Sequence, residues 1–284
     1  MSTYDRRVTP ARPDLAAAHL KGRIAAERYS KGRVSHIACA HTALRAEPSD
    51  DATLETELLF GENFTIYDER DGWVWGQAAL DSHVGYARAA DFVPRASEPT
   101  HRVVVRATPL LPAPDAKRPA REILPLNSKV EVAAASARFV RLKGGLYVFS
   151  GHVAPLSQHQ ADWVLVAEGF LGVPYVWGGK TFAGLDCSGL VQTALEAGGI
   201  EAPRDTDLME AALGHALPLD AKLRRGDLIF WKGHMGVMLD ATGLLHANGF
   251  AMCVSIEPLA TARRRIAADG LQVRAIKRLT GAET

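Results

Sequence analysis

Short runs of apolar and aromatic residues, separated by turn residues about every ten positions, fill residues 33–95 and restrict what this part of the chain can form. The clearest runs are residues 57–60, 63–67, 73–75 and 84–86. Asp71-Gly72 marks a tight turn between two of them. Short strands at this spacing predict a small β-barrel over residues 31–97.

A second set of short runs follows a stretch that is rich in proline. Five prolines between positions 99 and 119 predict a linker or loop over residues 96–118. Beyond this stretch come the runs at residues 129–132, 138–142 and 146–149, with a glycine turn at 143–145. Their order repeats that of the first set, so we expect a second small barrel over residues 98–155.

The two ends of the chain differ from these β-rich regions. Asp14 follows two prolines and is suited to cap a helix that runs to about Arg28, so residues 1–30 are predicted to form a helical segment. Residues 156–284 mix helical and extended patterns, and we expect an α+β domain there. Its predicted elements are helices at residues 162–169 and 188–196 and strands at residues 227–231, 234–239 and 244–247.

Composition excludes several classes of protein. The 284 residues carry a net charge of only +1, and the one dense basic run, Arg263-Arg264-Arg265, is short, so nucleic acid and anionic lipid are not expected partners. We find neither a secretory signal nor an apolar run of about 18 residues that would span a membrane. Three cysteines cannot build a disulfide framework. These features predict a soluble, intracellular protein.

Cys187 is the candidate nucleophile. It stands where a loop with Gly178-Gly179 enters a predicted helix, and the N–H groups at a helix N-terminus stabilise a thiolate and lower the pKa of the thiol. The alternative is a small buried core residue, which is the usual role of an unpaired cysteine. Cys39 and Cys253 lie in apolar β-like runs, and for them the core role is favoured.

His234 and His246 are the candidate bases. Their separation of twelve places both side chains on one face of a hairpin. A turn near Thr242 would put His246 opposite Met238 and leave His234 four residues along, roughly 13 Å away. Each histidine can also be a structural residue. A zinc site with Cys187 is a further alternative, although no C-x₂-C or H-x₃-H spacing supports it.

Five sequence blocks, in the same order over about 75 residues, resemble the NlpC/P60 family of cysteine peptidases. The blocks are Pro174-Tyr175-Val176-Trp177-Gly178-Gly179, Asp186-Cys187-Ser188-Gly189-Leu190-Val191, Arg225-Gly226-Asp227-Leu228-Ile229-Phe230, His234-Met235-Gly236-Val237 and His246-Ala247. The resemblance implies a papain-like fold without metal or cofactor. It makes Cys187 the nucleophile, His234 the base with an activity that rises near neutral pH, and His246 the residue that orients the base. Tyr175 matches a residue that positions the substrate carbonyl or its oxyanion.

The upstream barrels resemble the bacterial SH3-like domains of one subgroup of this family, in which an acidic residue of the barrel binds the substrate amine. Leu59-Phe60-Gly61-Glu62 matches that segment, so Glu62 is the candidate acid, with a solvated surface charge as the alternative. His83 stands where the family has a tyrosine. The resemblance also implies that Asp186 and Ser188 hold the amine end of the peptide and that Thr206 contributes a hydroxyl. Asp186 is equally suited to cap a helix.

The subgroup acts on short cell-wall peptides. We therefore expect a cytoplasmic cysteine endopeptidase that cuts the γ-D-glutamyl–diamino acid bond of murein peptides with a free N-terminal L-Ala. One alternative is an exported endopeptidase that acts on intact peptidoglycan. Another is a module that binds wall peptides without catalysis.

Overall fold

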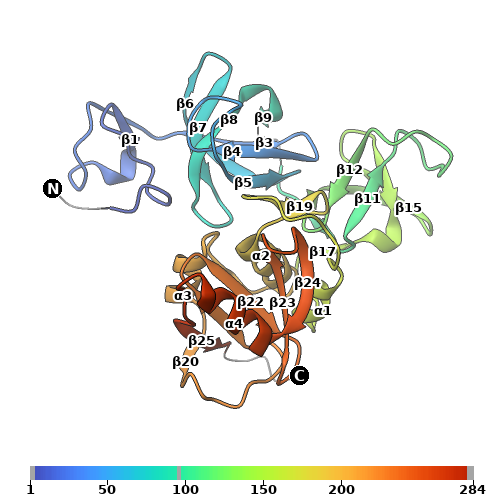
Figure 1. Ribbon diagram of the computed structural model, residues 1–284. Helices are drawn as coiled ribbons and strands as arrows, with labels where there is room; N and C mark the ends of the chain where they lie inside the picture. The colour runs from blue at the N-terminus through green and yellow to red at the C-terminus, as the bar shows by residue number, and fades with distance from the viewer. Residues whose placement is uncertain (1–3, 95–96, 280–284) are drawn as a thin grey trace. The chain divides into compact units, whose positions relative to one another are not determined.

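The computed structural model describes residues 4–94 and 97–279, and the chain divides into two compact units, one up to Gln158 and one from His159. The first unit is built from strands, and the second combines helices with a sheet (Figure 1). A mixed helix and sheet protein was predicted. No helix in the two described ranges is both long and apolar enough to cross a membrane.

A seven-stranded antiparallel sheet occupies residues 33–94. Its strands are β3 (Arg33–Ile37), β4 (His41–Arg45), β5 (Leu54–Leu59), β6 (Asn63–Arg70), β7 (Trp73–Ala78), β8 (Val84–Arg88) and β9 (Phe92–Pro94), in the spatial order β5-β4-β8-β7-β6-β3-β9. The buried side chains of alternate positions, including Leu44, Phe64 and Val74, form one core. Asp71 and Gly72 both have positive φ, as a tight hairpin turn requires, so the turn predicted there is confirmed.

The N-terminal segment is not helical, and the predicted helix from Asp14 to Arg28 is wrong. Strand β1 (Leu15–Ala17) pairs in parallel with β2 (Arg28–Ser30), and only a single 3₁₀ turn, Ala18–Leu20, lies between them. Gly22 has a φ of +84°, which would interrupt a helix. The apolar side chains of this segment pack in a cluster that includes Tyr67 of the sheet, so tertiary contacts outweigh local helix propensity.

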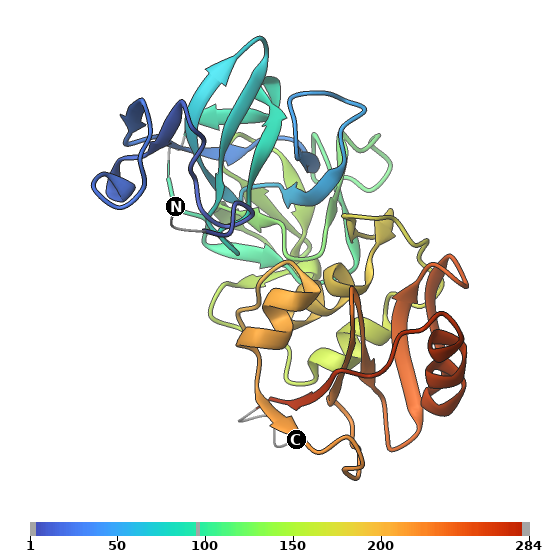
Figure 2. The same cartoon turned by 60° about the vertical axis from the view of Figure 1, so that its left-hand side comes forward.

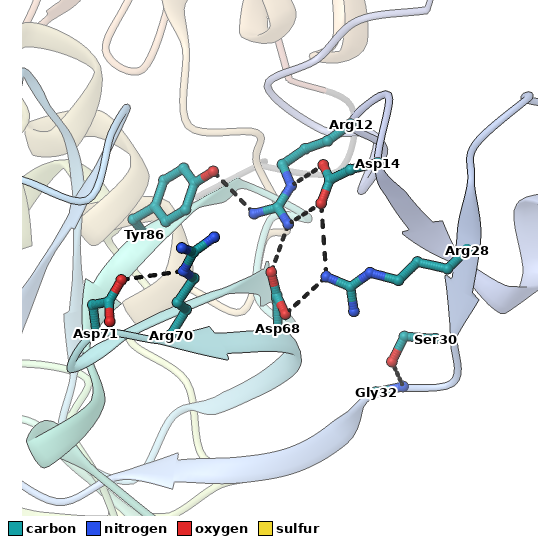
Figure 3. A network of polar contacts seen from close by, with 9 residues as sticks. All are labelled: Arg12, Asp14, Arg28, Ser30, Gly32, Asp68, Arg70, Asp71 and Tyr86. Atoms are coloured by element: carbon teal, nitrogen blue, oxygen red, sulfur yellow. Dashed lines mark hydrogen bonds and ion pairs between the residues drawn. The ribbon is translucent and has the colours of Figure 1, made fainter.

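A charged network fastens the N-terminal segment to the sheet (Figure 3). The Arg12 guanidinium donates to Asp14 at 2.9 Å, to Asp68 at 2.6 Å and to the Tyr86 hydroxyl at 3.0 Å. It also stacks over the Trp75 ring at 4.4 Å. Arg12 is therefore the central side chain of this contact.

Residues 101–155 form three small sheets around a shared apolar core. The strands are β10 (His101–Val103), β11 (Ala107–Leu110), β12 (Glu122–Pro125), β13 (Lys129–Val130), β14 (Val132–Ala135), β15 (Phe139–Leu142), β16 (Tyr147–Phe149) and β17 (Val153–Pro155). They pair as β13-β10-β17, β11-β12 and β14-β15-β16. Val103, Leu124 and Val148 are among the fully buried core residues.

The proline-rich stretch is not the linker that the sequence predicted, because β10 and β11 lie within it. Pro109 sits inside β11, opposite Ile123. Strand β11 belongs to a two-stranded sheet, where one side of the strand has no ladder partner, and proline is tolerated in such edge strands. Pro109 therefore lies in an edge strand and not in a linker.

The second unit places a six-stranded antiparallel sheet against helices. Its helices are α1 (Trp163–Glu168), α2 (Cys187–Ala197), α3 (Thr206–Ala212) and α4 (Leu259–Ala268). The sheet order is β20-β25-β21-β22-β23-β24, from β20 (His215–Leu217), β25 (Ala275–Arg278), β21 (Leu228–Trp231), β22 (His234–Met238), β23 (Gly243–Asn248) and β24 (Cys253–Pro258). A short hairpin, β18 (Lys180–Thr181) with β19 (Gly184–Leu185), precedes α2.

Helix α2 is the central element of this unit. Ten of its eleven residues are buried, and it packs against β22 and β23 (Figure 1). Asp162 caps α1 and Asp186 caps α2, so both predicted helices of this region are confirmed. Figure 2 shows α4 beside β24, the edge strand of the sheet.

Candidate active site

The first turn of α2 presents Cys187. The Asp186 side chain accepts a hydrogen bond from the Gly189 N–H at 2.6 Å, which caps the helix. Gly189 packs so closely on the preceding loop that a Cβ there would lie 2.2 Å from the carbonyl oxygen of Gly179. Gly179 of the loop and Gly189 of the helix therefore pack closely against each other, with no room for a larger residue at position 189.

Asp186 and Arg204 form a buried ion pair beneath this turn. The guanidinium of Arg204, 1% exposed, donates to both carboxylate oxygens at 3.0 and 2.7 Å. Arg204 also donates to the Ser188 hydroxyl at 2.8 Å, and the Gly178 N–H donates to Asp186 at 2.9 Å. The Asp186 carboxylate is thus already bound by several donors of this chain, which is the helix-capping alternative of the sequence analysis.

The Cys187 thiol is buried rather than exposed. Burial, together with the charge of Asp186, raises the pKa of Cys187, although hydrogen bonds from Thr206 and from the Met235 N–H act in the opposite direction. The Sγ atom lies 3.7 Å from Oγ1 of Thr206, the first residue of α3. The predicted lowering of this pKa is therefore wrong for the protein without substrate, because desolvation outweighs the helix N-terminus. A base is needed to remove the proton.

His234 and His246 lie in contact on neighbouring strands. Val237 pairs with Leu245, so His246 stands opposite Gly236, two residues from His234. Nε2 of His234 is 2.9 Å from Nδ1 of His246. The sequence-based register, with a gap of roughly 13 Å between the histidines, is wrong by two residues, and the observed diagonal is short enough for imidazoles to span.

Gly236 makes this approach possible. A Cβ at this position would lie 3.0 Å from Cβ of His246 and 2.8 Å from a methyl group of Leu244. Its neighbour Met235 donates to the sulfur of Cys187, which brings the start of β22 next to α2. Strand β22 therefore contacts the Cys187 thiol through Met235 and carries His234 of the histidine pair.

Glu257 extends the histidine pair and was not identified from the sequence. Its Oε1 lies 3.0 Å from Nε2 of His246, and it forms an ion pair with Arg265 of α4. The alternation of residues 253–257 is the signal that predicts a strand there. Arg265 belongs to the basic run Arg263-Arg264-Arg265, which is too short to indicate a nucleic-acid partner.

Both imidazoles are neutral at physiological pH. Burial, reinforced by the neighbouring His246, lowers the pKa of His234 to about 3. Burial and the nearby charge of Arg265 lower the pKa of His246 to about 4. A neutral His234 has one unprotonated ring nitrogen and can act as a base.

Tyr175 is half-buried in the loop before α2. Burial, followed by the charges of Cys187 and Asp186, raises the pKa of Tyr175 to about 12. Its hydroxyl therefore keeps its proton and can donate a hydrogen bond. The Tyr175 N–H donates to the Met252 carbonyl at 2.9 Å, which holds the loop against the start of β24.

Glu62 and His83 belong to the first unit. Glu62 is 2% exposed, so the surface-charge alternative is wrong, and its carboxylate accepts from the Leu59 N–H at 3.0 Å. His83 is 1% exposed, and its Nε2 lies 3.8 Å from Glu55. Within the described residues, neither ring nitrogen of His83 has a hydrogen-bond partner.

No metal cluster emerges in the part of the chain that the structure describes. Residues 4–94 and 97–279 contain no group of three or more His, Cys, Asp or Glu side chains placed to hold a metal ion. The facing nitrogens of His234 and His246 are instead hydrogen-bonded to each other.

Comparison with known families assigns two parts of the chain. Residues 172–265 match the NlpC/P60 family, and residues 44–92 match the bacterial dipeptidyl-peptidase SH3 domain. The first match contains α2, the histidine strands and Glu257. The second lies within the seven-stranded sheet.

Similar proteins match either most of the chain or about a third of it. A γ-D-glutamyl-L-lysine dipeptidyl-peptidase of Bacillus cereus is 28% identical over 240 residues, which cover 73% of this chain and 71% of that protein. Dipeptidyl-peptidase 6 of Lysinibacillus sphaericus is 25% identical over 72% of this chain and 84% of its own length. The peptidoglycan endopeptidase RipB of Mycobacterium tuberculosis is 35% identical over 106 residues, which are 31% of this chain and 43% of RipB.

A crystal structure of an NlpC/P60 family protein from Bacillus cereus has the same fold. It superposes with a TM-score of 0.74 at 20% identity and covers 86% of this chain and 99% of its own. Together with the two domain matches, these relatives confirm the family that the sequence blocks indicated. The chain contains an NlpC/P60 cysteine peptidase domain, and a bacterial dipeptidyl-peptidase SH3 domain precedes it in the sequence.

Proposed function

We propose that this enzyme hydrolyses the γ-D-glutamyl–diamino acid bond of short murein peptides with a free N-terminal L-Ala. The observation that carries the proposal is that Met235, the neighbour of His234 on β22, donates its N–H to the Cys187 sulfur, while His234 is hydrogen-bonded to His246. The names of the relatives from Bacillus and Lysinibacillus support the bond type. The proposed role is peptide recycling in the cytoplasm.

The proposed reaction begins with proton transfer from Cys187 to His234. The thiolate attacks the γ-glutamyl carbonyl carbon, and the tetrahedral intermediate collapses to a thioester as His234 returns the proton to the departing amine. His234 then removes a proton from water, which attacks the thioester, releases the γ-carboxyl product and restores the thiol. N–H groups of the first turn of α2 and the Tyr175 hydroxyl are the proposed oxyanion donors.

Glu62 is the proposed partner of the substrate's ammonium group. Its carboxylate is buried, and a buried carboxylate attracts a positive charge in the same site, such as a free peptide amine, more strongly than a surface carboxylate does. Asp186 is a weaker candidate because Arg204 already neutralises it. Ser188 and Thr206 are proposed to contact the peptide as well. His83 is proposed as a further contact, since its buried ring nitrogens accept or donate no hydrogen bond among the described residues.

The proposed domain arrangement follows the same subgroup. Residues 31–97 and 98–155 are two SH3-like barrels, and residues 156–284 are the catalytic domain. The second barrel is supported by the small sheets β10–β17 and their common core. Residues 1–30 are an N-terminal segment that Arg12 fastens to the first barrel.

The test uses L-Ala-γ-D-Glu-diaminopimelate with a free or an acetylated N-terminus, with products identified by mass spectrometry. Acetylation is expected to lower kcat/KM by roughly 30- to several-thousand-fold, since it removes the positive charge that the buried carboxylate is proposed to bind, at a cost of about 2–5 kcal/mol. The Glu62→Gln variant should lose much of this preference. Glu69→Gln, an exposed carboxylate on the same sheet, should keep it.

The second candidate is an endopeptidase of intact peptidoglycan, which the similarity to RipB over 106 residues favours. Equal rates on free and acetylated peptides, together with release of fragments from whole sacculi, would reject the recycling role in its favour.

Activity is expected to persist after treatment with a chelator. Loss of activity that added zinc restores would reject the cysteine mechanism.

A further inference from the structure

Glu257 stands on the face of the sheet that carries His246. In the β23–β24 ladder His246 pairs with Ser255, and Glu257 follows two residues later. Side chains two residues apart on a strand share a face, and such a diagonal is within reach of long side chains. The 3.0 Å contact between Oε1 and Nε2 of His246 is the result.

Arg265 holds the Glu257 carboxylate in its orientation toward His246. The guanidinium pairs with the same oxygen that faces His246. It also stacks at 4.4 Å over the Phe250 ring, which fixes its position from the β23–β24 loop. The two side chains of the ion pair are only 19% and 22% exposed, so water screens their interaction less than that of a surface pair.

This hydrogen-bond chain assigns the protons of both histidines. An ionised carboxylate only accepts, so Nε2 of His246 must carry the hydrogen. A neutral imidazole holds one hydrogen, so Nδ1 of His246 is an acceptor, and the contact at 2.9 Å requires Nε2–H of His234 as donor. The remaining nitrogen of His234, Nδ1, is then unprotonated.

We propose that Glu257 is a positioning residue that acts through His246 to hold the hydrogen of His234 on Nε2, leaving Nδ1 to accept the proton of Cys187. The proposal rests on the function proposed above and adds a fourth member to its catalytic group. Without Glu257, His246 can carry its hydrogen on Nδ1 and donate it to His234. That tautomer protonates the wrong nitrogen of the base.

Glu257 also acts during the reaction. When His234 accepts the Cys187 proton it becomes an imidazolium, and the negative charge of Glu257 lies two hydrogen bonds away. The ion pair with Arg265 limits this effect by sharing the carboxylate charge. Orientation of the tautomers is therefore the larger expected contribution.

The experiment compares wild type with Glu257→Ala and Glu257→Gln in the full chain. Loss of the carboxylate should lower kcat roughly 10- to 100-fold with little change in KM, as removal of such supporting groups does elsewhere. Glu257→Gln should restore most of the rate. Its amide oxygen can still accept from His246, and Arg265, a donor only, holds that oxygen in place.

Glu168→Ala is the matched control. Glu168 also pairs with an arginine, Arg225, at 2.6 Å in the same unit and is 27% exposed, but it does not contact the histidines. Its variant should keep the wild-type kcat. If Glu257→Ala fails to fold, Arg265→Gln retains the carboxylate without its ion pair and should lower kcat by a smaller factor.

Two readouts need no substrate. Nitrogen NMR of the histidine rings should show Nε2–H tautomers for His234 and His246 in wild type and Glu257→Gln, and a shift toward Nδ1–H in Glu257→Ala. The rate of Cys187 alkylation by iodoacetamide near pH 7, located by mass spectrometry, should fall in parallel with kcat. If wild type fails to cut the murein peptide, these readouts still test Glu257 and only the proposed substrate is rejected. Unchanged tautomers in Glu257→Ala, or a kcat within twofold of wild type, would overturn the proposal.

Discussion

Nε2 of His234 lies 2.9 Å from Nδ1 of His246, although twelve residues separate them. The contact depends on the strand register, in which Val237 pairs with Leu245. His246 then stands opposite Gly236, two residues from His234 along β22, and the glycine leaves room between the strands for the rings to meet. A shift of this register by two residues would part the rings by a further 6–7 Å, at about 3.3 Å per residue. The strand pairing is thus as important for the site as the histidines themselves.

Gly236→Ala should therefore reduce both activity and stability. The new Cβ would meet His246 and Leu244 at 3.0 and 2.8 Å and push the imidazoles apart. We expect a loss of kcat/KM of tenfold or more, up to roughly 100-fold, and about 1–3 kcal/mol of unfolding free energy. Gly243→Ala in the same hairpin is the control, because its Cβ would approach other atoms no closer than 3.6 Å. Equal kinetic effects of both substitutions would contradict this account.

Cys187→Ser should abolish hydrolysis while leaving the fold intact. A hydroxyl of the same shape is not ionised at physiological pH, and removal of a nucleophile commonly lowers the rate by ~10³-fold or more. Cys253→Ser, at a half-buried position outside the proposed reaction, should retain activity. Peptide hydrolysis and the thermal midpoint of unfolding are the two measurements. A Cys187→Ser rate within a few-fold of wild type would rule out the cysteine mechanism.

The acid limb of the pH–rate profile should lie well below neutrality. The resemblance to the family leads to an expectation near pH 7, but burial lowers the pKa of His234 to about 3. Above that pH the imidazole is neutral and ready to accept a proton, so kcat/KM should stay flat from about pH 5 to 7. The groups that act on this pKa are His246, Arg265 and Glu257. A limb centred near pH 6.5 would show that His234 is not buried in solution.

Stability should fall on the acidic side for the same reason. The pKa of both histidines is lower in the folded protein than the unfolded value of about 6.5. The unfolded chain binds more protons in this window, so stability rises with pH. The two neutral histidines contribute fully to the free energy of unfolding above about pH 6.5. This contribution is lost as the pH falls toward about 4, the pKa of His246, and then toward about 3, the pKa of His234. Urea unfolding of wild type between pH 7 and 4.5 should show a steeper loss than a His234→Gln, His246→Asn variant.

Arg12→Ala should loosen the N-terminal segment. It removes the contacts to Asp68, Asp14 and Tyr86 and the stacking on Trp75 (Figure 3). The free energy needed to open this segment locally should fall by about 1–3 kcal/mol. Proteolytic cleavage within residues 4–30 should then be roughly 5- to 150-fold faster.

Arg70→Ala is the matched control for Arg12. Arg70 is 86% exposed and pairs only with its neighbour Asp71 among the ion pairs of the described residues. Limited proteolysis with mass spectrometry measures both variants. Equal cleavage of Arg12→Ala and wild type would show that apolar packing alone holds the segment.

Local patterns in the sequence were sufficient for much of the molecule. The Asp71-Gly72 turn, the runs that form β5 to β8, the helix over residues 162–169 and the Asp186 cap all depend on residues near in sequence. The position of Cys187 at a helix start follows from the same local signals. Turn and cap preferences act over a few residues, so they can be recognised without knowledge of the rest of the chain.

Tertiary structure decided what no local pattern contains. The β22–β23 register joined His234 to His246, and the next strand and helix brought Glu257 and Arg265 to them from positions that the sequence did not connect. Burial reversed the expected pKa shift of Cys187. Desolvation, strand register and long-range ion pairs depend on atoms distant in sequence, so only the fold determines them. The residue types that perform the chemistry can be identified from the sequence alone.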